Sequence, residues 1–278
     1  MSADALFDGR FFLIAGPCVL EDDALNLRVA ESLAELRVRT GVPIIYKASF
    51  DKANRSRAGA ARGPGLEQGL RRLERVGSAT GLPLLTDIHE AEQAGPVAQV
   101  CDVLQIPAFL GRQTDLVEAA GRTGRPVNIK KGQWMAPEDI AGAVAKARGA
   151  GAGAVAVTER GTFLGYGDLV VDMRSFTRMR EAASVPVVFD GTHSVQRPGR
   201  ADGASGGDPR FIQPLVLAAM AAGADALFLE VHPEPARAPS DGSNMLQLDR
   251  LPALLERVLD VRAAALQERQ EAERAGSR

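Results

Sequence analysis

Eight short apolar runs recur along this chain, and each is followed by a stretch in which apolar residues repeat at helical spacing. The runs are continuous rather than alternating, which is typical of parallel strands that are buried on both faces. Several of the amphipathic stretches between them end in glycine, as helices often do. Eight strand–helix units predict a single (β/α)8 TIM barrel, with strands at residues 11–16, 43–49, 83–88, 102–107, 126–130, 153–158, 186–191 and 225–231.

The alternative fold is a doubly wound open sheet, but no Gly-x-Gly-x-x-Gly motif follows the first run. A length of 278 residues suits one barrel, and no linker or change of composition interrupts residues 10–265. We therefore expect one domain over residues 1–278, with residues 1–10 and 267–278 peripheral and the polar tail fraying into disorder. Several long polar segments follow strands, so we expect long loops at the C-terminal face, where the active sites of such barrels lie.

The composition excludes several classes of protein. A net charge of -2 gives no support for a nucleic-acid partner or an anionic membrane, and no run approaches the ~18–20 apolar residues of a membrane span. The first residues lack the basic and apolar regions of a signal peptide. The 2 cysteines do not make a disulfide framework, so we expect a cytoplasmic protein.

All 3 histidines and four of the five lysines lie at or just beyond the ends of the predicted strands. These ends converge in a closed barrel, so their side chains should meet at one site. Ammonium groups and a guanidinium together suit a multiply charged anion, and the candidates are Lys47, Lys52, Lys130 and Arg160. One loop continues with groups that suit a second phosphate, namely Asn54, Arg55 and Ser56. The pattern indicates an enzyme that acts on phosphorylated anions.

The strand ends also carry candidate metal ligands. Cys18 follows the first predicted strand, His193 follows the seventh, and Glu230 and Asp241 belong to the eighth strand and its loop. A thiolate, an imidazole and two carboxylates suit a borderline divalent ion such as Zn, Fe, Mn or Co. The residues alone leave a second interpretation open, in which Cys18 is a packed thiol and His193 a hydrogen-bonded scaffold.

Four further residues have less specific interpretations. We interpret Cys101, near the entry to the fourth strand, as a core residue. His89 and Glu90 stand at the start of a predicted helix, and the sequence does not decide between a capping role and a catalytic role for them. His232 either supports the site or is structural.

The motifs at the strand ends are AGPCVLE, YKASFDKANRS, TDIHE, QIPAFLGRQTDL, NIKKGQ, TERGTFLGYGDLVVD, FDGTHSVQRPG and FLEVHPEP with SDG. Together they resemble the 3-deoxy-D-manno-octulosonate 8-phosphate (KDO 8-phosphate) synthase family, over residues 11–260. The sister family, 3-deoxy-D-arabino-heptulosonate 7-phosphate synthase, typically carries Lys-Pro-Arg-Thr-Ser where this chain has KANRS at 52–56. The resemblance therefore implies arabinose 5-phosphate rather than erythrose 4-phosphate as the aldose.

The implied reaction is an aldol-type condensation of phosphoenolpyruvate with D-arabinose 5-phosphate and water, which serves lipopolysaccharide biosynthesis. By similarity, phosphoenolpyruvate is bound by Lys47, Ser49, Lys52, Gln105, Lys130 and Arg160. The sugar phosphate is bound by Asn54, Arg55 and Ser56, with Asp87 lining its site and Arg112 reaching in from a neighbouring subunit of a homotetramer. The expected catalytic residues are Lys47, Lys52, Lys130, Asp87, His193 and Asp241.

The resemblance also implies a metal ion. Members of the family with Cys after Gly-Pro at the first strand are metal-dependent, and this chain has Cys18 there. The implied ligands are Cys18, His193, Glu230 and Asp241. Gly242 departs from the pattern, because a glycine after this aspartate is more typical of metal-independent members. Two other functions stay open: the seven-carbon synthase that uses erythrose 4-phosphate, and a non-catalytic barrel that binds sugar phosphates.

Overall fold

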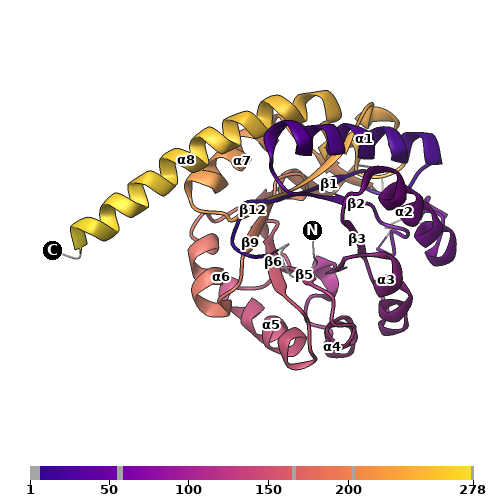
Figure 1. The fold of residues 1–278 in the computed structure, drawn as a ribbon, viewed down its shortest axis with the longest axis horizontal. Coiled ribbons are helices and arrows are strands. Elements are labelled where there is room, and N and C mark those ends of the chain that lie inside the picture. The colour runs from indigo at the N-terminus through magenta and orange to yellow at the C-terminus, as the bar shows by residue number, and fades with distance from the viewer. Residues whose placement is uncertain (1–6, 55–58, 165–166, 202–203, 277–278) are drawn as a thin grey trace.

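The computed structural model describes residues 7–54, 59–164, 167–201 and 204–276, and its centre is a closed ring of parallel strands (Figure 1). The barrel strands are β1 (Leu13–Gly16), β2 (Ile44–Lys47), β3 (Leu84–Asp87), β4 (Val103–Ile106), β5 (Val127–Lys130), β6 (Val155–Glu159), β9 (Val187–Asp190) and β12 (Ala226–His232). Each of them overlaps one of the apolar runs, and their residues are buried throughout.

The ring closes at β1, which pairs in parallel with both β2 and β12. Leu13 lies opposite Ile44 on one side and opposite Leu227 on the other. The remaining strands pair in chain order from β2 to β12. The (β/α)8 barrel is therefore confirmed. The doubly wound open sheet is excluded, because such a sheet has two edge strands that each pair on one side only.

Helices surround the ring (Figure 1). They are α1 (Asp23–Thr40), α2 (Leu66–Thr80), α3 (Ala94–Val100), α4 (Thr114–Arg122), α5 (Ile140–Gly149), α6 (Ser175–Ala183), α7 (Ile212–Ala221) and α8 (Leu251–Gly276). In α1, the Asp22 side chain accepts a hydrogen bond from the Leu25 N–H at 2.8 Å, and Gly41 ends the helix in the left-handed conformation. Cys101 is buried in the main hydrophobic cluster, as interpreted from the sequence.

A second hydrophobic cluster fills the inside of the barrel at the N-terminal end of the strands. Phe7 belongs to the segment expected to be peripheral, yet it is 8% exposed and its ring centroid lies 5.2 Å from that of Phe12. The segment therefore contributes to the core at Phe7. The cluster consists of Phe7, Phe12, Ile14, Ile45, Leu85, Val103, Ala156, Val188, Ala226 and Phe228.

The loops at the C-terminal face contain short strands that the apolar runs do not predict. β7 (Thr162–Phe163) pairs with β8 (Leu169–Val170), β10 (Gln196–Ala201) pairs with β11 (Ala204–Gly207), and β13 (Leu246–Gln247) pairs with β12. The expectation that the polar tail frays was wrong, because α8 continues to Gly276 and extends beyond the barrel (Figure 1). Within the described ranges, no helix is long and apolar enough to cross a membrane.

Candidate active site

Polar side chains fill the C-terminal end of the barrel, directly above the inner hydrophobic cluster. Successive residues of a strand point to opposite faces, so the residue two positions after an inward apolar residue also points inward. In β2 this step leads from Ile45 to Lys47, and in β3 from Leu85 to Asp87. The same step in β4, β9 and β12 leads to buried Gln105, Asp190 and Glu230.

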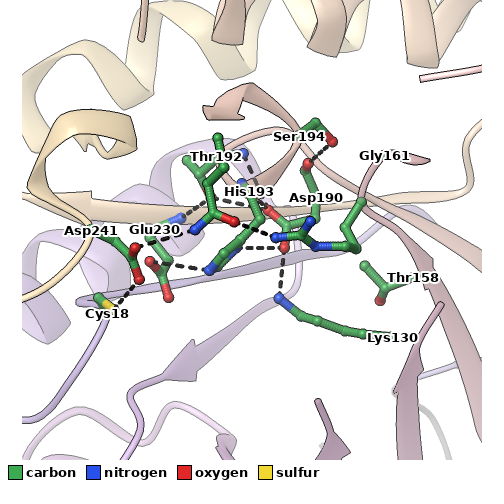
Figure 2. Close-up of polar contacts among 12 residues, drawn as sticks. Cys18, Lys130, Thr158, Gly161, Asp190, Thr192, His193, Ser194, Glu230 and Asp241 are labelled. Carbon is green, nitrogen blue, oxygen red and sulfur yellow. Dashed lines mark hydrogen bonds and ion pairs between the residues drawn. The ribbon is translucent and has the colours of Figure 1, made fainter. Parts of the chain in front are cut away.

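Three lysines of this site each lie beside a buried carboxylate. Lys47 Nζ is 2.7 Å from Glu230 Oε1, and Lys52 Nζ is 3.7 Å from the same oxygen. Lys130 Nζ is 2.6 Å from Asp190 Oδ2 (Figure 2). The lysines singled out in the sequence therefore meet in one site, and the carboxylates hold their ammonium groups in place.

Arg160 differs from these lysines because it has no carboxylate partner among the described residues. It follows β6, is 4% exposed, and its Nη1 has no hydrogen-bond partner there. Its backbone is fixed by Glu159, whose Oε1 accepts from the N–H groups of Arg160 and Gly161 at 3.0 and 2.7 Å. Lys131 Nζ lies 3.6 Å from Glu159 Oε2. A buried guanidinium with a free N–H suits an anionic ligand.

Asp87 anchors a chain of buried hydrogen bonds that runs from the end of β2 to β6. Its carboxylate accepts from Ser49 Oγ and, at 2.5 Å, from Gln105 Nε2. Asn128 Nδ2 donates to Gln105 Oε1 at 2.8 Å, and Thr158 Oγ1 donates to Asn128 Oδ1 at 2.8 Å. Such a connected network holds the floor of the site in a single arrangement.

Three of the four implied metal ligands form a compact group (Figure 2). Cys18, Glu230 and Asp241 each offer an atom within 4.8 Å of the others. His193 adjoins this group, since its Nε2 is 3.6 Å from Glu230 Oε2 while its Nδ1 is 2.7 Å from Asp190 Oδ2. A carboxylate on one ring nitrogen commonly orients a metal-binding histidine. Glu230 Oε2 is buried and has no hydrogen-bond partner among the residues that the structure describes, so these residues fit a divalent ion.

Burial and neighbouring charges set the protonation of these groups. Burial raises the pKa of the Cys18 thiol well above its usual value, and Glu230 adds to the rise. The thiol is therefore protonated when no metal is bound, and it lies 3.1 Å from Asp241 Oδ2. Burial acts to raise the pKa of Glu230 as well, but Lys47 and His193 outweigh it and lower that pKa. Metal binding would displace the thiol proton.

The loop that carries Asp241 is tightly folded. Asp241 itself has a left-handed backbone with φ of 52°. At Gly242, a Cβ atom would lie 2.2 Å from the carbonyl oxygen of Pro235. The glycine that departs from the metal-dependent pattern is thus required by this close approach, and Asp241 stays within the ligand group.

Of the residues implied to bind the sugar phosphate, Asp87 lies in this site. Asn54 is exposed, and Arg55 and Ser56 lie outside the described residues. Arg112 is also exposed, and it lines a separate hollow with Asp139, Gly142, Ala143 and Lys146.

Sequence reasoning missed Asp190, Glu159 and Gln196. Asp190 had a usable signal, because it follows Val188 by one inward step along β9. Glu159 pairs with Lys131, the residue directly after β5, and no local pattern in the sequence connects these two residues. Gln196 lies in a loop without periodicity, so no pattern selects it.

The sequence left the roles of His89, Glu90 and His232 undecided, and the structure gives contacts for Glu90 and His232. Glu90, next to His89, forms a capping box on the short helix Ala91–Gln93, which confirms the capping interpretation for Glu90. His232 Nε2 lies 3.1 Å from Glu21 Oε1. His232 therefore pairs outside the ligand group.

Comparison with known proteins gives one family and consistent relatives. Residues 7–267 match the DAHP synthetase I family. A protein of Syntrophotalea carbinolica named 2-dehydro-3-deoxyphosphooctonate aldolase is 53% identical over 263 residues, which is 94% of this chain and 95% of the relative. A Synechococcus protein of the same name is 54% identical over 252 residues, or 91% and 88% of the two chains.

Proposed function

Because the chain belongs to the DAHP synthetase I family, we propose that it is an enzyme that condenses phosphoenolpyruvate with D-arabinose 5-phosphate and water. The products are 3-deoxy-D-manno-octulosonate 8-phosphate and inorganic phosphate. The relatives at 53–54% identity are named for the same eight-carbon sugar acid phosphate. The observation that carries the proposal is the convergence of Lys47, Lys130 and Arg160 on one buried polar site at the C-terminal end of the barrel.

Phosphoenolpyruvate is a small, multiply charged anion, and these cations suit it. We propose that its phosphate and carboxylate are held by Lys47, Lys52, Lys130 and Arg160, whose Nη1 has no hydrogen-bond partner in the described part of the chain. C3 of the enol then forms the new bond to the aldehyde carbon, and the aldehyde oxygen takes up a proton. Positive character at C2 is met by water, which loses a proton, and the C2–O bond to phosphate breaks. Fixed cations and the holding of two anions together lower this barrier.

For the second substrate we propose Asn54, Arg55, Ser56 and Asp87, with Arg112 supplied by another subunit of a homotetramer. Exposed aromatic surface near Arg112 supports an assembly. Phe109 and Trp134 are 49% and 48% exposed, and their ring centroids lie 5.7 Å apart. Apolar patches of this kind commonly mark protein interfaces. Light scattering after gel filtration tests the tetramer, and a monomeric active enzyme would exclude Arg112 from the site.

We also propose the metal-dependent subclass, with Cys18, His193, Glu230 and Asp241 holding Zn, Fe, Mn or Co. Such an ion supplies Lewis acidity, which polarises either the aldehyde or the attacking water. The chain's own residues prepare the site: Asp190 orients His193, and Lys47 keeps Glu230 ionised. A cytoplasmic location, which keeps thiols reduced, agrees with two free cysteines and with the use of Cys18 as a ligand.

The decisive experiment measures phosphate release from phosphoenolpyruvate with each aldose phosphate, before and after metal removal. We expect turnover with arabinose 5-phosphate, little with erythrose 4-phosphate, loss of activity in a strong chelator and recovery with added Mn, Co, Fe or Zn. Preference for erythrose 4-phosphate would instead support the seven-carbon synthase. Full activity after verified metal removal would contradict metal dependence. No turnover with either aldose phosphate would support the alternative of a non-catalytic barrel that binds sugar phosphates.

A further inference from the structure

Gln196 is a buried amide that lies between a cation and a carboxylate of the proposed site. It begins β10 just after His193, and it is 8% exposed. Its Nε2 donates to Asp241 Oδ1 at 3.2 Å, and its Oε1 accepts from Arg160 Nη2. A guanidinium only donates and a carboxylate only accepts, so one orientation of the amide satisfies both neighbours.

The two charged groups that Gln196 contacts differ from other charges of the site in their ion pairing. Glu230 and Asp190 each pair directly with a lysine, at 2.7 and 2.6 Å. Neither Arg160 nor Asp241 has an oppositely charged partner within 4.0 Å anywhere in the described part of the chain. The two nevertheless share one electrostatic environment: burial lowers the pKa of Arg160, and Asp241 is among the charges that oppose this.

We propose that Gln196 is a positioning residue that prevents Arg160 and Asp241 from pairing with each other. This inference rests on the proposed function, in which Arg160 binds phosphoenolpyruvate and Asp241 binds a divalent ion. If the two charges paired directly, each ligand would have to break a buried ion pair before it could bind. The amide satisfies one donor of Arg160 and one acceptor of Asp241 while both charges stay available to ligands.

The backbone around Gln196 is held against the loop that carries Asp241. In the β10–β11 hairpin Gln196 lies opposite Gly207. Gly207 packs against this loop so closely that a Cβ atom there would lie 2.7 Å from Cβ of Asn244. The spacing between the amide and the Asp241 carboxylate is therefore set by backbone packing, and it does not depend on the side chains alone.

The test compares Gln196→Leu with the wild type and with Gln247→Leu, a matched control. Gln247 is a half-buried amide on β13 whose Nε2 donates to Asp249 at 3.2 Å. Zn²⁺ affinity is measured on metal-free protein without substrates, by competition with a chromophoric chelator. Phosphate release gives KM for phosphoenolpyruvate and kcat, and thermal unfolding reports folding.

In Gln196→Leu we expect Zn²⁺ affinity to fall and KM for phosphoenolpyruvate to rise, each by about tenfold to a hundredfold, the range for hydrogen bonds to charged groups. We expect kcat at saturating metal and substrates to change much less. Gln247→Leu should match the wild type in both affinities.

A double-mutant cycle separates this role from simple structural support. In an Arg160→Met background the guanidinium can no longer pair with Asp241, so adding Gln196→Leu should no longer weaken Zn²⁺ binding. An equal loss of affinity in both backgrounds, or unchanged affinity in Gln196→Leu, would overturn the inference. Wild-type protein that binds no Zn²⁺ would contradict the proposed metal site first, and with it the separating role of Gln196. Should Gln196→Leu fail to fold, Gln196→Met carries the same comparison.

Discussion

The two ends of the barrel are built from the same strands and from opposite kinds of side chain. Towards the N-terminal end, Ile45 and Leu85 lie in the inner hydrophobic cluster. One inward step later, about 7 Å along the strand, Lys47 and Asp87 belong to the polar site. The hydrophobic cluster and the polar site are thus separated by only one inward step along each of these strands. Substitutions at the apolar end should change stability alone, and those at the polar end should change catalysis.

The largest effect should follow from removing the unpaired cation at the polar end. Arg160→Met should lower kcat/KM about 10²–10³-fold, as the loss of one preorganised donor does in other enzymes. The unfolding free energy should not fall, because no carboxylate of the described residues pairs with Arg160 and a buried charge is removed. Steady-state phosphate release and urea denaturation measure the two quantities. A large loss of stability would show that Arg160 is part of the packing.

The apolar end should respond in the opposite way. Leu85→Ala should lower the unfolding free energy by about 2–5 kcal/mol, because it removes a fully buried side chain and leaves a cavity. The kcat of the folded fraction should match the wild type at a temperature where both are folded. A reduced kcat there would mean that the two ends are mechanically coupled.

A smaller effect, on the pH dependence of stability, is expected at Asp87 of the polar end. Burial acts to raise the pKa of Asp87, but the charges of Lys47 and Lys52 outweigh it and lower that pKa. Ionised Asp87 therefore adds stability above the unfolded-state pKa of about 3.9, and this stability is lost as the pH falls further. The difference in unfolding free energy between the wild type and Asp87→Asn should be constant from about pH 7 to 5 and shrink below about pH 4.

Urea denaturation at a series of pH values measures this difference. The matched variant Leu85→Ala should show a deficit that does not change with pH. If the Asp87→Asn difference were the same at neutral and acidic pH, ionisation of Asp87 would contribute no stability.

The smallest change tests how tightly the apolar layer is packed. Ile45→Val removes one methylene group from a fully buried position and should cost about 0.5–1.5 kcal/mol. Denaturation of the variant beside the wild type measures the cost, and KM for both substrates should be unchanged. A shift in KM would show that Ile45 positions Lys47 rather than only filling space.

The strands could be predicted because their signal is local. A strand buried on both faces must be apolar throughout, so runs such as PLLTDI mark it without reference to any partner. Once the strands are located, the lysines at their ends can be predicted to share one site, because a closed barrel brings all of these ends together. The strand ends offered candidate metal ligands, but only the family resemblance favoured a metal site over a packed thiol and a scaffold histidine, because Cys18 and Asp241 stand at opposite ends of the chain.

What could not be predicted depends on contacts between distant segments. Gln196 matters only through Arg160 and Asp241, which are 36 and 45 residues away in the chain. Lys130 and Lys131 are adjacent in sequence, yet Lys130 pairs with Asp190 and Lys131 with Glu159, so adjacency does not indicate a shared partner. The β10–β11 hairpin also lacks the apolar run of a barrel strand, so its pairing had no local signal.

The closure of the ring at β1 and β12 has a consequence for how the molecule folds. Gly16 lies opposite Glu230 in this pairing, so the first and last strands meet only after nearly the whole chain has been gathered. Contacts between such distant residues form late in folding. Both cysteines are free and buried, but Cys101 stands in the short connection from α3 to β4, while Cys18 lies at the closing point. During refolding, Cys101 should resist a pulse of thiol reagent early, and protection of Cys18 should mark the moment at which the ring closes.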